Sequence, residues 1–317
     1  MSSRLIPTAV TFKPQSDPDD VRFGTFISKT NLSLLPETSR VAILGFPTDV
    51  GVERNGGRPG ASRAPDEIRK YLYKLTPDAS HFAECCELLK TVVDLGNIEC
   101  SRNLEQDQEH LAFVVAELLK KNIVPIVLGG GHETGYGHFL GYANNQTKVN
   151  ILNIDAHTDV RPLKDNQAHS GSPFRQALLH ASAGCAHYKV MGLNPYTVAV
   201  VHLEFMKQHN GSFEFQSFSD KEVQDYFAKT TGDIMVTLDM DAVDQAYAPG
   251  VSAPNAYGIT PQQWLMVAQT AGVCAKVKSL DICEVNPLFD SDGHTARLAA
   301  LTIAHFMAGL QKRLRND

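Results

Sequence analysis

The stretch KVNILNIDAHTDVRP, residues 148–162, decides the fold class of this chain. Its first part, Lys148–Asp155, is aliphatic and β-branched and therefore predicts a buried strand. The polar residues Asp155, His157 and Asp159 then follow at alternate positions. Because alternate side chains of extended backbone share one face, the end of this strand should present three chemically active groups together.

Further strands and helices alternate along the rest of the chain, which predicts βαβ units. They imply an α/β fold in which helices cover both faces of a central, mainly parallel sheet of about eight strands. The other predicted strands are residues 40–47, 91–95, 123–128, 188–193, 213–218, 233–239 and 277–284. The predicted helices are residues 64–75, 106–121, 197–208, 220–229, 261–271 and 295–314.

Composition excludes several classes of protein. Of 317 residues, 43% are hydrophobic and 20% charged, which predicts a packed core rather than disorder. The net charge of −6 leaves no basic field for a nucleic-acid backbone. No apolar run is long enough to span a membrane and no export signal is recognised at the start, so a cytoplasmic location is expected. The six cysteines show no CxxC spacing and are expected to be reduced and mostly buried.

The sequence predicts two parts of unequal size. Residues 1–38 are polar and proline-containing, with a DPDD run, and are interpreted as an irregular amino-terminal arm that packs on the outside. Residues 39–317 are interpreted as a single catalytic domain.

Acids and histidines gather at three predicted strand ends. These are GGGHE at residues 129–133, DAHTD at 155–159 and DMD at 239–241. In parallel sheets the chemistry lies at the carboxyl ends of the strands. Several carboxylates buried together need cations to neutralise them, which favours two divalent metal ions. Carboxylate and imidazole ligands without thiolate favour Mn²⁺, although Zn²⁺, Ni²⁺ and Fe²⁺ stay open.

These residues have two other interpretations. The acids and histidines could be helix caps and solvated turn residues, which is reasonable for any one of them but not for all six positions together. The glycines of residues 129–131 could cradle a phosphate, but GGGHE lacks the spacing of the known phosphate-binding loops. A tight turn that lets the backbone approach the site is the simpler interpretation.

At these residues the sequence resembles the ureohydrolase superfamily of arginases, agmatinases, guanidino-acid hydrolases and formimidoylglutamases. The resemblance runs in order from about residue 40 to about residue 310. It rests on these segments: GFPTDVGVERNGGRPGASRAPDEIR (45–69), VVDLGNI (92–98), VLGGGHE (127–133), NIDAHTDVRP (153–162), SGSPFRQ (170–176), LDMDAVDQAYAPGVSAPNAYGI (238–259) and SLDICEVNPLFDSDGHTARLAA (279–300). DAHTD together with LDMD is highly specific.

The resemblance implies a three-layer α/β/α fold, two Mn²⁺ ions per subunit and a trimer or hexamer. It assigns one ion to His132, Asp155, Asp159 and Asp239, and the other to Asp155, His157, Asp239 and Asp241. It also implies that a water between the two metals attacks a cationic amidine carbon. By the same resemblance Asp159 transfers a proton to the leaving nitrogen, and Glu284 pairs with the amidinium. A surface acid after a strand is the alternative interpretation of Glu284.

Four features favour the formimidoylglutamase branch. The chain has GGGHE where most arginases and agmatinases have GGDHS, and its loop at residues 247–257 matches that branch better than the arginase loop. Phe174 stands where arginases have a histidine, so the arginase proton shuttle is expected to be absent, and neither His138 nor His169 is supported as its replacement. Arg161 offers a fork suited to a substrate carboxylate, although a loop salt bridge is an alternative.

The expected activity is therefore hydrolysis of N-formimidoyl-L-glutamate to L-glutamate and formamide, a step of histidine degradation. Arg175 is a second residue expected to contact the substrate, an amidine or guanidine that carries a carboxylate. The alternatives are a guanidino-acid hydrolase that releases urea, an agmatinase or arginase, and a non-catalytic member of the family that keeps its metals.

Overall fold

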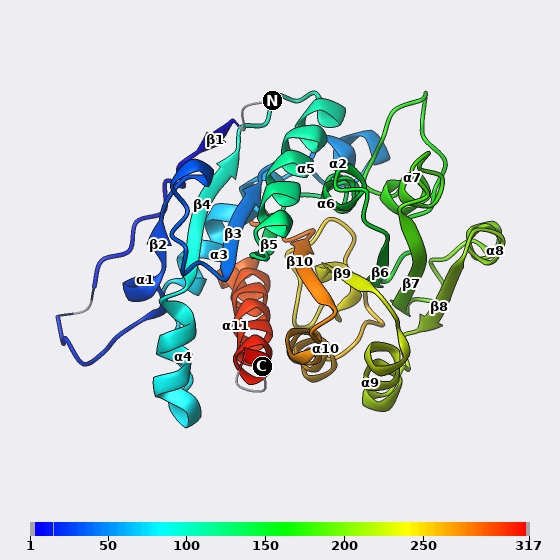
Figure 1. The fold of residues 1–317 in the computed structure, drawn as a ribbon. Coiled ribbons are helices and arrows are strands. Elements are labelled where there is room, and N and C mark those ends of the chain that lie inside the picture. Colours follow the sequence, from blue (N-terminus) through cyan, green and yellow to red (C-terminus); the bar gives the residue numbers. More distant parts are fainter. Residues whose placement is uncertain (1–3, 15, 315–317) are drawn as a thin grey trace.

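One sheet organises the molecule (Figure 1). The computed structural model describes residues 4–14 and 16–314, and within them ten strands have the order β1-β4-β3-β5-β10-β9-β6-β7-β8, with β2 paired to β4. All of these pairs are parallel except β1 with β4. The strands are β1 (Leu5–Ile6), β2 (Ser28–Lys29), β3 (Val41–Phe46), β4 (Val92–Ile98), β5 (Val124–Gly129), β6 (Val149–Ile154), β7 (Cys185–Leu193), β8 (Gly211–Phe215), β9 (Asp233–Asp239) and β10 (Val277–Cys283).

The predicted α/β fold is confirmed. The eight strands of five or more residues correspond to the eight stretches predicted from the sequence. Every residue of β3, β4, β5 and β6 is buried, as expected for parallel strands covered on both faces.

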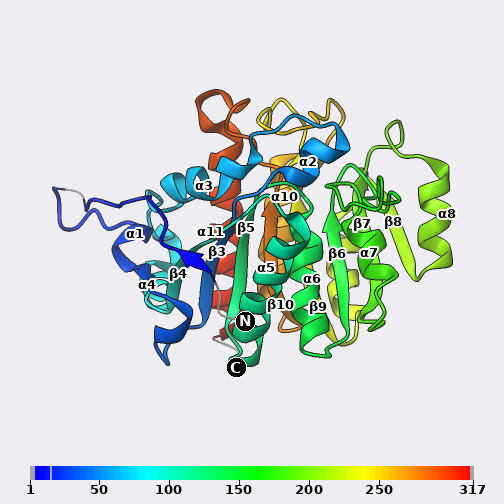
Figure 2. The same ribbon diagram turned by 90° about the horizontal axis from the view of Figure 1, so that it is seen from above.

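Helices form a layer on each face of the sheet, and Figures 1 and 2 show the two layers on opposite sides. One layer contains α5 (Leu104–Lys120), α6 (Thr134–Asn144) and α7 (Pro173–Leu178), with α8 (Val200–Gln208) beside β8. The other contains α3 (Ala64–Leu72), α4 (Phe82–Leu89), α9 (Asp220–Lys229), α10 (Pro261–Val273) and α11 (His294–Leu314). Single 3-10 turns occupy Leu32–Leu34, Ala61–Arg63, Ala79–His81, Met240–Ala242 and Ser291–Gly293.

Helices α10 and α11 pack closely enough that only glycine fits at two facing positions. A Cβ on Gly309 would lie 2.2 Å from the carbonyl oxygen of Gln269, and one on Gly272 would lie 2.1 Å from that of Phe306. The indole of Trp264, fully buried in α10, donates a hydrogen bond of 2.7 Å to the Thr302 hydroxyl of α11. The two helices therefore form one rigid pair against the sheet.

The sequence did not predict every helix. Besides α4, α6 and α7, it missed α2 (Val50–Asn55), which lies over the carboxyl edge of the sheet in Figure 2, and α1 (Phe23–Phe26). No helix in the described part of the chain is long and apolar enough to cross a membrane.

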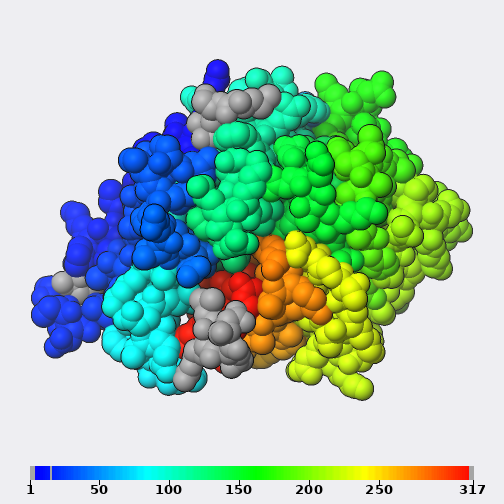
Figure 3. Space-filling view, viewed as in Figure 1, coloured from blue at the N-terminus to red at the C-terminus, as the bar shows by residue number. Residues whose placement is uncertain are grey.

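The amino-terminal segment is more ordered than an irregular outer arm. Residues 4–14 and 16–38 cover the β4 end of the molecule (Figure 3), but they contribute β1 and β2 to the sheet. Val10, Phe23 and Ile27 are also buried in the main hydrophobic core. The apolar side chains scattered among the polar residues explain the difference, because three of them join the same buried cluster as side chains of the sheet and its helices. The boundary after residue 38 stays a prediction.

Candidate metal centre

Four neighbouring strands bring the predicted site residues together. In the sheet β5, β10, β9 and β6 lie side by side, although the chain makes them in a different order. His132 and Glu284 follow β5 and β10, Asp239 ends β9, and Asp155 follows β6 directly. Since these strands are parallel, their carboxyl ends meet at one edge of the sheet.

Three carboxylates converge on one nitrogen of His132. Its Nδ1 lies 3.2 Å from Asp155 Oδ2, 2.9 Å from Asp159 Oδ2 and 3.0 Å from Asp239 Oδ2. All four side chains are at least nine-tenths buried. Despite these short distances, Nδ1 has no partner with hydrogen-bond geometry. Side chains that bind one metal ion are arranged around it in this way.

A second group adjoins the first. His157 Nδ1 lies 3.1 Å from Asp241 Oδ2 and 3.6 Å from Asp155 Oδ1. Asp155 therefore faces both histidines with its two oxygens. The second group contains Asp155, His157 and Asp241, whereas Asp239 clusters with the first group only. A shared role for Asp155 agrees with this geometry, and a shared role for Asp239 stays a prediction.

The buried carboxylates of the centre outnumber the two histidines that could balance their negative charge. Burial raises the pKa of Asp159 to about 6, and the neighbouring charge of Asp155 adds to the shift. Burial and the charges of Asp241 and Asp155 raise the pKa of Asp239 well above its ordinary range. Burial would also raise the pKa of Asp155, but its two histidine partners outweigh that effect and lower it. The raised pKa values follow from burial beside like charges, and a bound cation would stabilise the ionised form of each of these carboxylates.

The two histidines of the cluster have raised pKa values because carboxylates surround them. Burial would lower the pKa of His132, but the three surrounding carboxylates raise it well above the ordinary value. The charge of Asp241 raises the pKa of His157 even against burial. Divalent ions would supply this missing positive charge, and a ligand set of carboxylates and imidazoles without thiolate suits a hard cation such as Mn²⁺. The unpaired atoms His132 Nδ1 and Asp241 Oδ1 fit the same interpretation.

Two site residues have left-handed backbone, which non-glycine residues adopt rarely. The φ angles are 48° at Asp159 and 66° at Glu284. The backbone at Asp159 is held by a hydrogen bond of 3.1 Å from the Phe174 amide to the Asp159 carbonyl. That at Glu284 is held by a 2.8 Å bond from its own amide to the Gly130 carbonyl. Such conformations cost about 1–3 kcal/mol and concentrate at functional sites.

A cavity of about 320 Å³ opens onto the cluster. Glu284 lines it, and its Oε1 accepts a 2.8 Å hydrogen bond from the His132 amide while Oε2 has no partner. Burial, followed by the charges of Glu133 and Asp241, raises the pKa of Glu284 well above its ordinary range. Arg161, which is exposed, lines the same cavity, and its side chain makes no ion pair with the described residues.

Other residues singled out from the sequence lie elsewhere. Arg175 does not line the cavity, because its guanidinium stacks 4.0 Å over Phe205 and donates to the Val160 carbonyl. Phe174 packs edge-on against His132 with ring centroids 5.1 Å apart. His169 bonds to the Pro162 carbonyl, and His138 to Asp281. Neither histidine lines the cavity.

Four polar residues that line the cavity were not predicted from the sequence: Asn55, Arg58, Ser170 and Ser252. Two of them lie in the segment RNGGRPG at 54–60, where paired glycines after α2 were a signal for a loop that approaches the site. Arg58 is anchored by hydrogen bonds from its Nε and Nη2 to the carbonyls of Ser252 and Val251.

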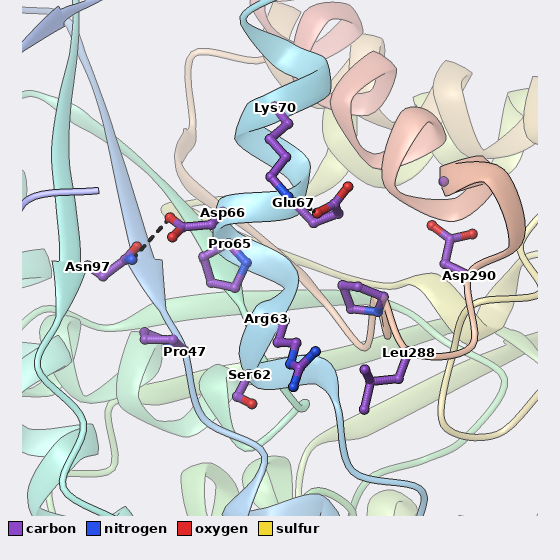
Figure 4. A pocket seen from close by; sticks show the side chains of 12 residues that line it. Pro47, Ser62, Arg63, Pro65, Asp66, Glu67, Lys70, Asn97, Leu288 and Asp290 are labelled. Carbon is purple, nitrogen blue, oxygen red and sulfur yellow. Dashed lines mark hydrogen bonds and ion pairs between the residues drawn. The ribbon is translucent and has the colours of Figure 1, made fainter. Parts of the chain in front are cut away.

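A larger cavity of about 540 Å³ lies beside α3 and contains none of the predicted site residues (Figure 4). Its charged groups largely satisfy one another or the backbone. Lys70 pairs with Glu67, Asp66 accepts from Asn97, and Asp290 accepts from two amides at the start of α11. The chemistry therefore belongs to the smaller cavity.

Comparison with known proteins places these features in context. The family model described as the arginase family matches residues 39–309. A protein named formimidoylglutamase from Geobacillus sp. (strain WCH70) is 36% identical over 288 residues, which cover 86% of this chain and 85% of that one. The formimidoylglutamase of Legionella pneumophila (strain Paris) is 34% identical over 294 residues, which cover 89% of each.

Solved structures show the same fold. The Trypanosoma cruzi formiminoglutamase solved with two Mn²⁺ ions has a TM-score of 0.81 and 29% identity, covering 93% of this chain and 100% of that chain. The structure of formimidoylglutamase from Bacillus subtilis subsp. subtilis str. 168 has a TM-score of 0.83 over 97% of this chain and 96% of that one. At 23% identity, this second similarity bears on the fold alone.

Proposed function

Because this chain belongs to the arginase family, we propose that it is a formimidoylglutamase, which hydrolyses N-formimidoyl-L-glutamate to L-glutamate and formamide. The observation that carries the proposal is the composition of one cavity. It combines the carboxylate and imidazole cluster with the unpaired Glu284 Oε2 and the exposed Arg161. These groups match a metal-activated water, an amidinium and a carboxylate, in that order.

The cofactor is two Mn²⁺ ions per subunit. His132, Asp155, Asp159 and Asp239 would hold one ion, and Asp155, His157 and Asp241 the other, with Asp239 proposed as a second shared ligand. When bound, the ions supply the Lewis acidity that makes a water molecule nucleophilic at neutral pH.

Asp159 is proposed to move the proton. It belongs to the first ligand group and also lines the cavity, so it faces both the attacking water and the substrate. Its carboxylate accepts the proton that the water loses and delivers it to the nitrogen that leaves as glutamate. A general acid–base step of this kind supplies about 10²–10⁴-fold in rate.

Glu284 and Arg161 are proposed to orient the substrate. Glu284 Oε2 is buried without a hydrogen-bond donor, and the N–H groups of an amidinium would satisfy it. Arg161 offers a planar fork that pairs with a carboxylate through two parallel hydrogen bonds. Arg175, by contrast, already donates to a backbone carbonyl and stacks on Phe205, so Arg161 is the better candidate.

The decisive experiment compares substrates. Protein loaded with Mn²⁺ is offered formimidoylglutamate, guanidinobutyrate, agmatine and arginine, and formamide and urea are measured. Formamide from the first substrate, with little urea from the others, is expected. Urea as the main product from guanidinobutyrate would instead identify a guanidino-acid hydrolase.

Two further proposals concern the oligomeric state and the cellular location. We propose a homo-oligomer, a trimer or hexamer, in the cytoplasm. Exposed apolar side chains beside and on α8 support self-association, because Tyr196, Val200 and Val201 are 87%, 68% and 63% exposed. Light scattering on the eluting protein measures the assembly, and cell fractionation checks the location.

A further inference from the structure

A chain of buried polar residues starts at His132, on the ring nitrogen that does not face the carboxylates. Nε2 of His132 lies 2.9 Å from the Thr237 hydroxyl, which donates a 2.5 Å hydrogen bond to Asp281 Oδ1. The other oxygen of Asp281 lies 2.5 Å from His138 Nδ1. Thr237, Asp281 and His138 are fully buried, and none of them lines the cavity.

The chain continues on the far side of His138. Its Nε2 lies 2.6 Å from the Ser279 hydroxyl, which lies 2.5 Å from the Tyr142 hydroxyl. Ser279 and Tyr142 are also almost completely buried. The sheet places this chain, because Thr237 lies in β9 while Ser279 and Asp281 lie in the adjacent β10, and Asp281 pairs with Thr237 in the register. His138 and Tyr142 face them from α6.

The hydrogen atoms in the first part of this chain have only one consistent arrangement. An ionised carboxylate can only accept, so Thr237 must give its single hydroxyl hydrogen to Asp281. The Thr237 oxygen then accepts from His132, which requires the hydrogen of His132 to be on Nε2. In the neutral form of His132 that binds a metal, Nδ1 then keeps its lone pair and faces Asp155, Asp159 and Asp239, where the metal would bind.

We propose that Asp281 is a positioning residue that, through Thr237, fixes the tautomer and ring orientation of the metal ligand His132. The role of His138 is to hold Asp281 from the opposite side. Metal-binding histidines usually donate their second N–H directly to a carboxylate or carbonyl. Here one hydroxyl stands between the imidazole and the carboxylate. The inference rests on the proposed metal centre but concerns residues that do not touch metal or substrate.

The test measures Mn²⁺ affinity rather than turnover. The free ion is followed by its electron paramagnetic resonance signal as it is titrated into wild type, Thr237→Val and Thr237→Ser. Valine has the shape of threonine without the hydroxyl, so one of the two ions should bind about 10–100-fold more weakly, as is typical when such outer partners are lost. Serine keeps the hydroxyl and should restore binding. Thr302→Ala removes an equally buried hydroxyl of α11, outside this chain of contacts, and should leave Mn²⁺ affinity unchanged.

A double variant identifies Asp281 as the source of the effect. Asp281→Asn should weaken the same ion in wild type but add nothing in the Thr237→Val background, because both changes break one series of contacts. Equal weakening by Asp281→Asn in both backgrounds would overturn the proposal. If Asp281→Asn does not fold, Thr237→Val decides the matter, and full binding of both ions by that variant would also overturn it.

Thermal unfolding of the metal-free variants separates positioning from simple packing, because lost stability with unchanged Mn²⁺ affinity would reveal a structural role only. The result of this Mn²⁺-affinity test is also independent of whether the proposed substrate is correct. A wild type that binds two ions but produces no formamide would refute the substrate assignment without affecting this comparison.

Discussion

Asp155 is the residue on which the two ligand groups depend, because each of its oxygens faces a different histidine. We expect Asp155→Ala to abolish tight binding of both Mn²⁺ ions and all turnover, since two close cations would lose their shared anion. Asp239→Ala should do the same if Asp239 also bridges. Elemental analysis after gel filtration measures the metal content. Asp225→Ala, which removes an exposed carboxylate paired with Lys229 on α9, is the matched control. Two tightly held ions in Asp155→Ala would contradict the assignment.

Asp159 belongs to the first group of converging side chains and also lines the cavity, so its two proposed roles can be separated. Asn keeps an oxygen donor but cannot accept and deliver a proton. We therefore expect Asp159→Asn to retain part of its metal and to lose about 10²–10⁴-fold in kcat. Steady-state kinetics at saturating Mn²⁺ checks this. Activity within about threefold of wild type would remove Asp159 from proton transfer.

Arg161 lines the cavity and is proposed to select substrates that carry a carboxylate. We expect Arg161→Ala to lower kcat/KM for formimidoylglutamate by about 10–150-fold, because a charged hydrogen bond contributes about 1.5–3 kcal/mol. Arg161→Lys should raise KM less than Ala does, since it keeps the charge but not the planar fork. Metal content should not change in either variant.

Two comparisons complete this test. Arg297→Ala removes an arginine that stacks on Tyr71, away from the cavity, and should leave the kinetics unaltered. Agmatine has no carboxylate and should remain a poor substrate of the wild type. An unaltered kcat/KM in Arg161→Ala, or a wild type that prefers agmatine, would refute the role of Arg161.

At the scale of elements, the backbones of α10 and α11 approach each other so closely at Gly272 and Gly309 that a side chain there would collide with a carbonyl oxygen. We expect Gly309→Ala to destabilise the protein by about 1–3 kcal/mol, because the new methyl group meets the Gln269 carbonyl and backbone cannot move aside easily. The gain in helix propensity, up to about 1 kcal/mol, works in the opposite direction. Urea unfolding measures the change. Leu301→Ala, at a 40% exposed position of the same helix, should alter stability much less.

The elements also show what local sequence could predict. The long strands were predictable because each is a short, continuous, apolar run. Helix α6 was not, since Gly135, Gly137 and Gly141 give it a poor intrinsic propensity. The structure explains the glycines, because a Cβ on Gly141 would lie 2.5 Å from Val115 Cγ1 of α5. Helix α6 therefore depends on packing that no local pattern records.

Some features of the candidate site were also predictable from the sequence, and others were not. The residues of the cluster follow or end parallel strands, so the sequence predicts that they lie at one edge of the sheet. That they also meet depends on the strand order β5-β10-β9-β6. The left-handed backbone of Asp159 and Glu284 was not predictable, because it is imposed by bonds to Phe174 and Gly130 from other segments. Arg161 and Arg175 lie only fourteen positions apart, yet one lines the cavity and the other stacks on α8. Loop side chains of this kind are placed by tertiary contacts.

For the whole molecule, stability should depend on pH and Mn²⁺ together. Asp159, Asp239, His132 and His157 have raised pKa values, so the folded state holds their protons more tightly than the unfolded state does. Their contribution to stability is present at low pH and is lost as pH rises through those values, beginning near about 6 for Asp159. Asp155, with a lowered pKa, contributes in the opposite direction.

Mn²⁺ replaces these protons, so its stabilising effect should grow as pH rises. We expect the increase in melting temperature on adding Mn²⁺ to be larger at about pH 7.5 than at about pH 5.5, and an excess of about 100-fold over Kd should add about 2.7 kcal/mol. Calorimetry with and without the ion measures it. An increase that is the same at both pH values would contradict a centre built from these carboxylates.

The position of β10 in the sheet has a consequence for how the protein is made. This strand is the last in the chain, yet it lies between β5 and β9 at the centre. While the ribosome is still synthesising residues before Val277, the nascent chain can hold only two half-sheets with an open seam between them. Both sides of that seam expose unpaired strand edges, which other nascent chains or chaperones can bind. His132 and Asp239 meet across this seam only after β10 fills it, so the ion that both would hold can bind only once synthesis has passed Cys283.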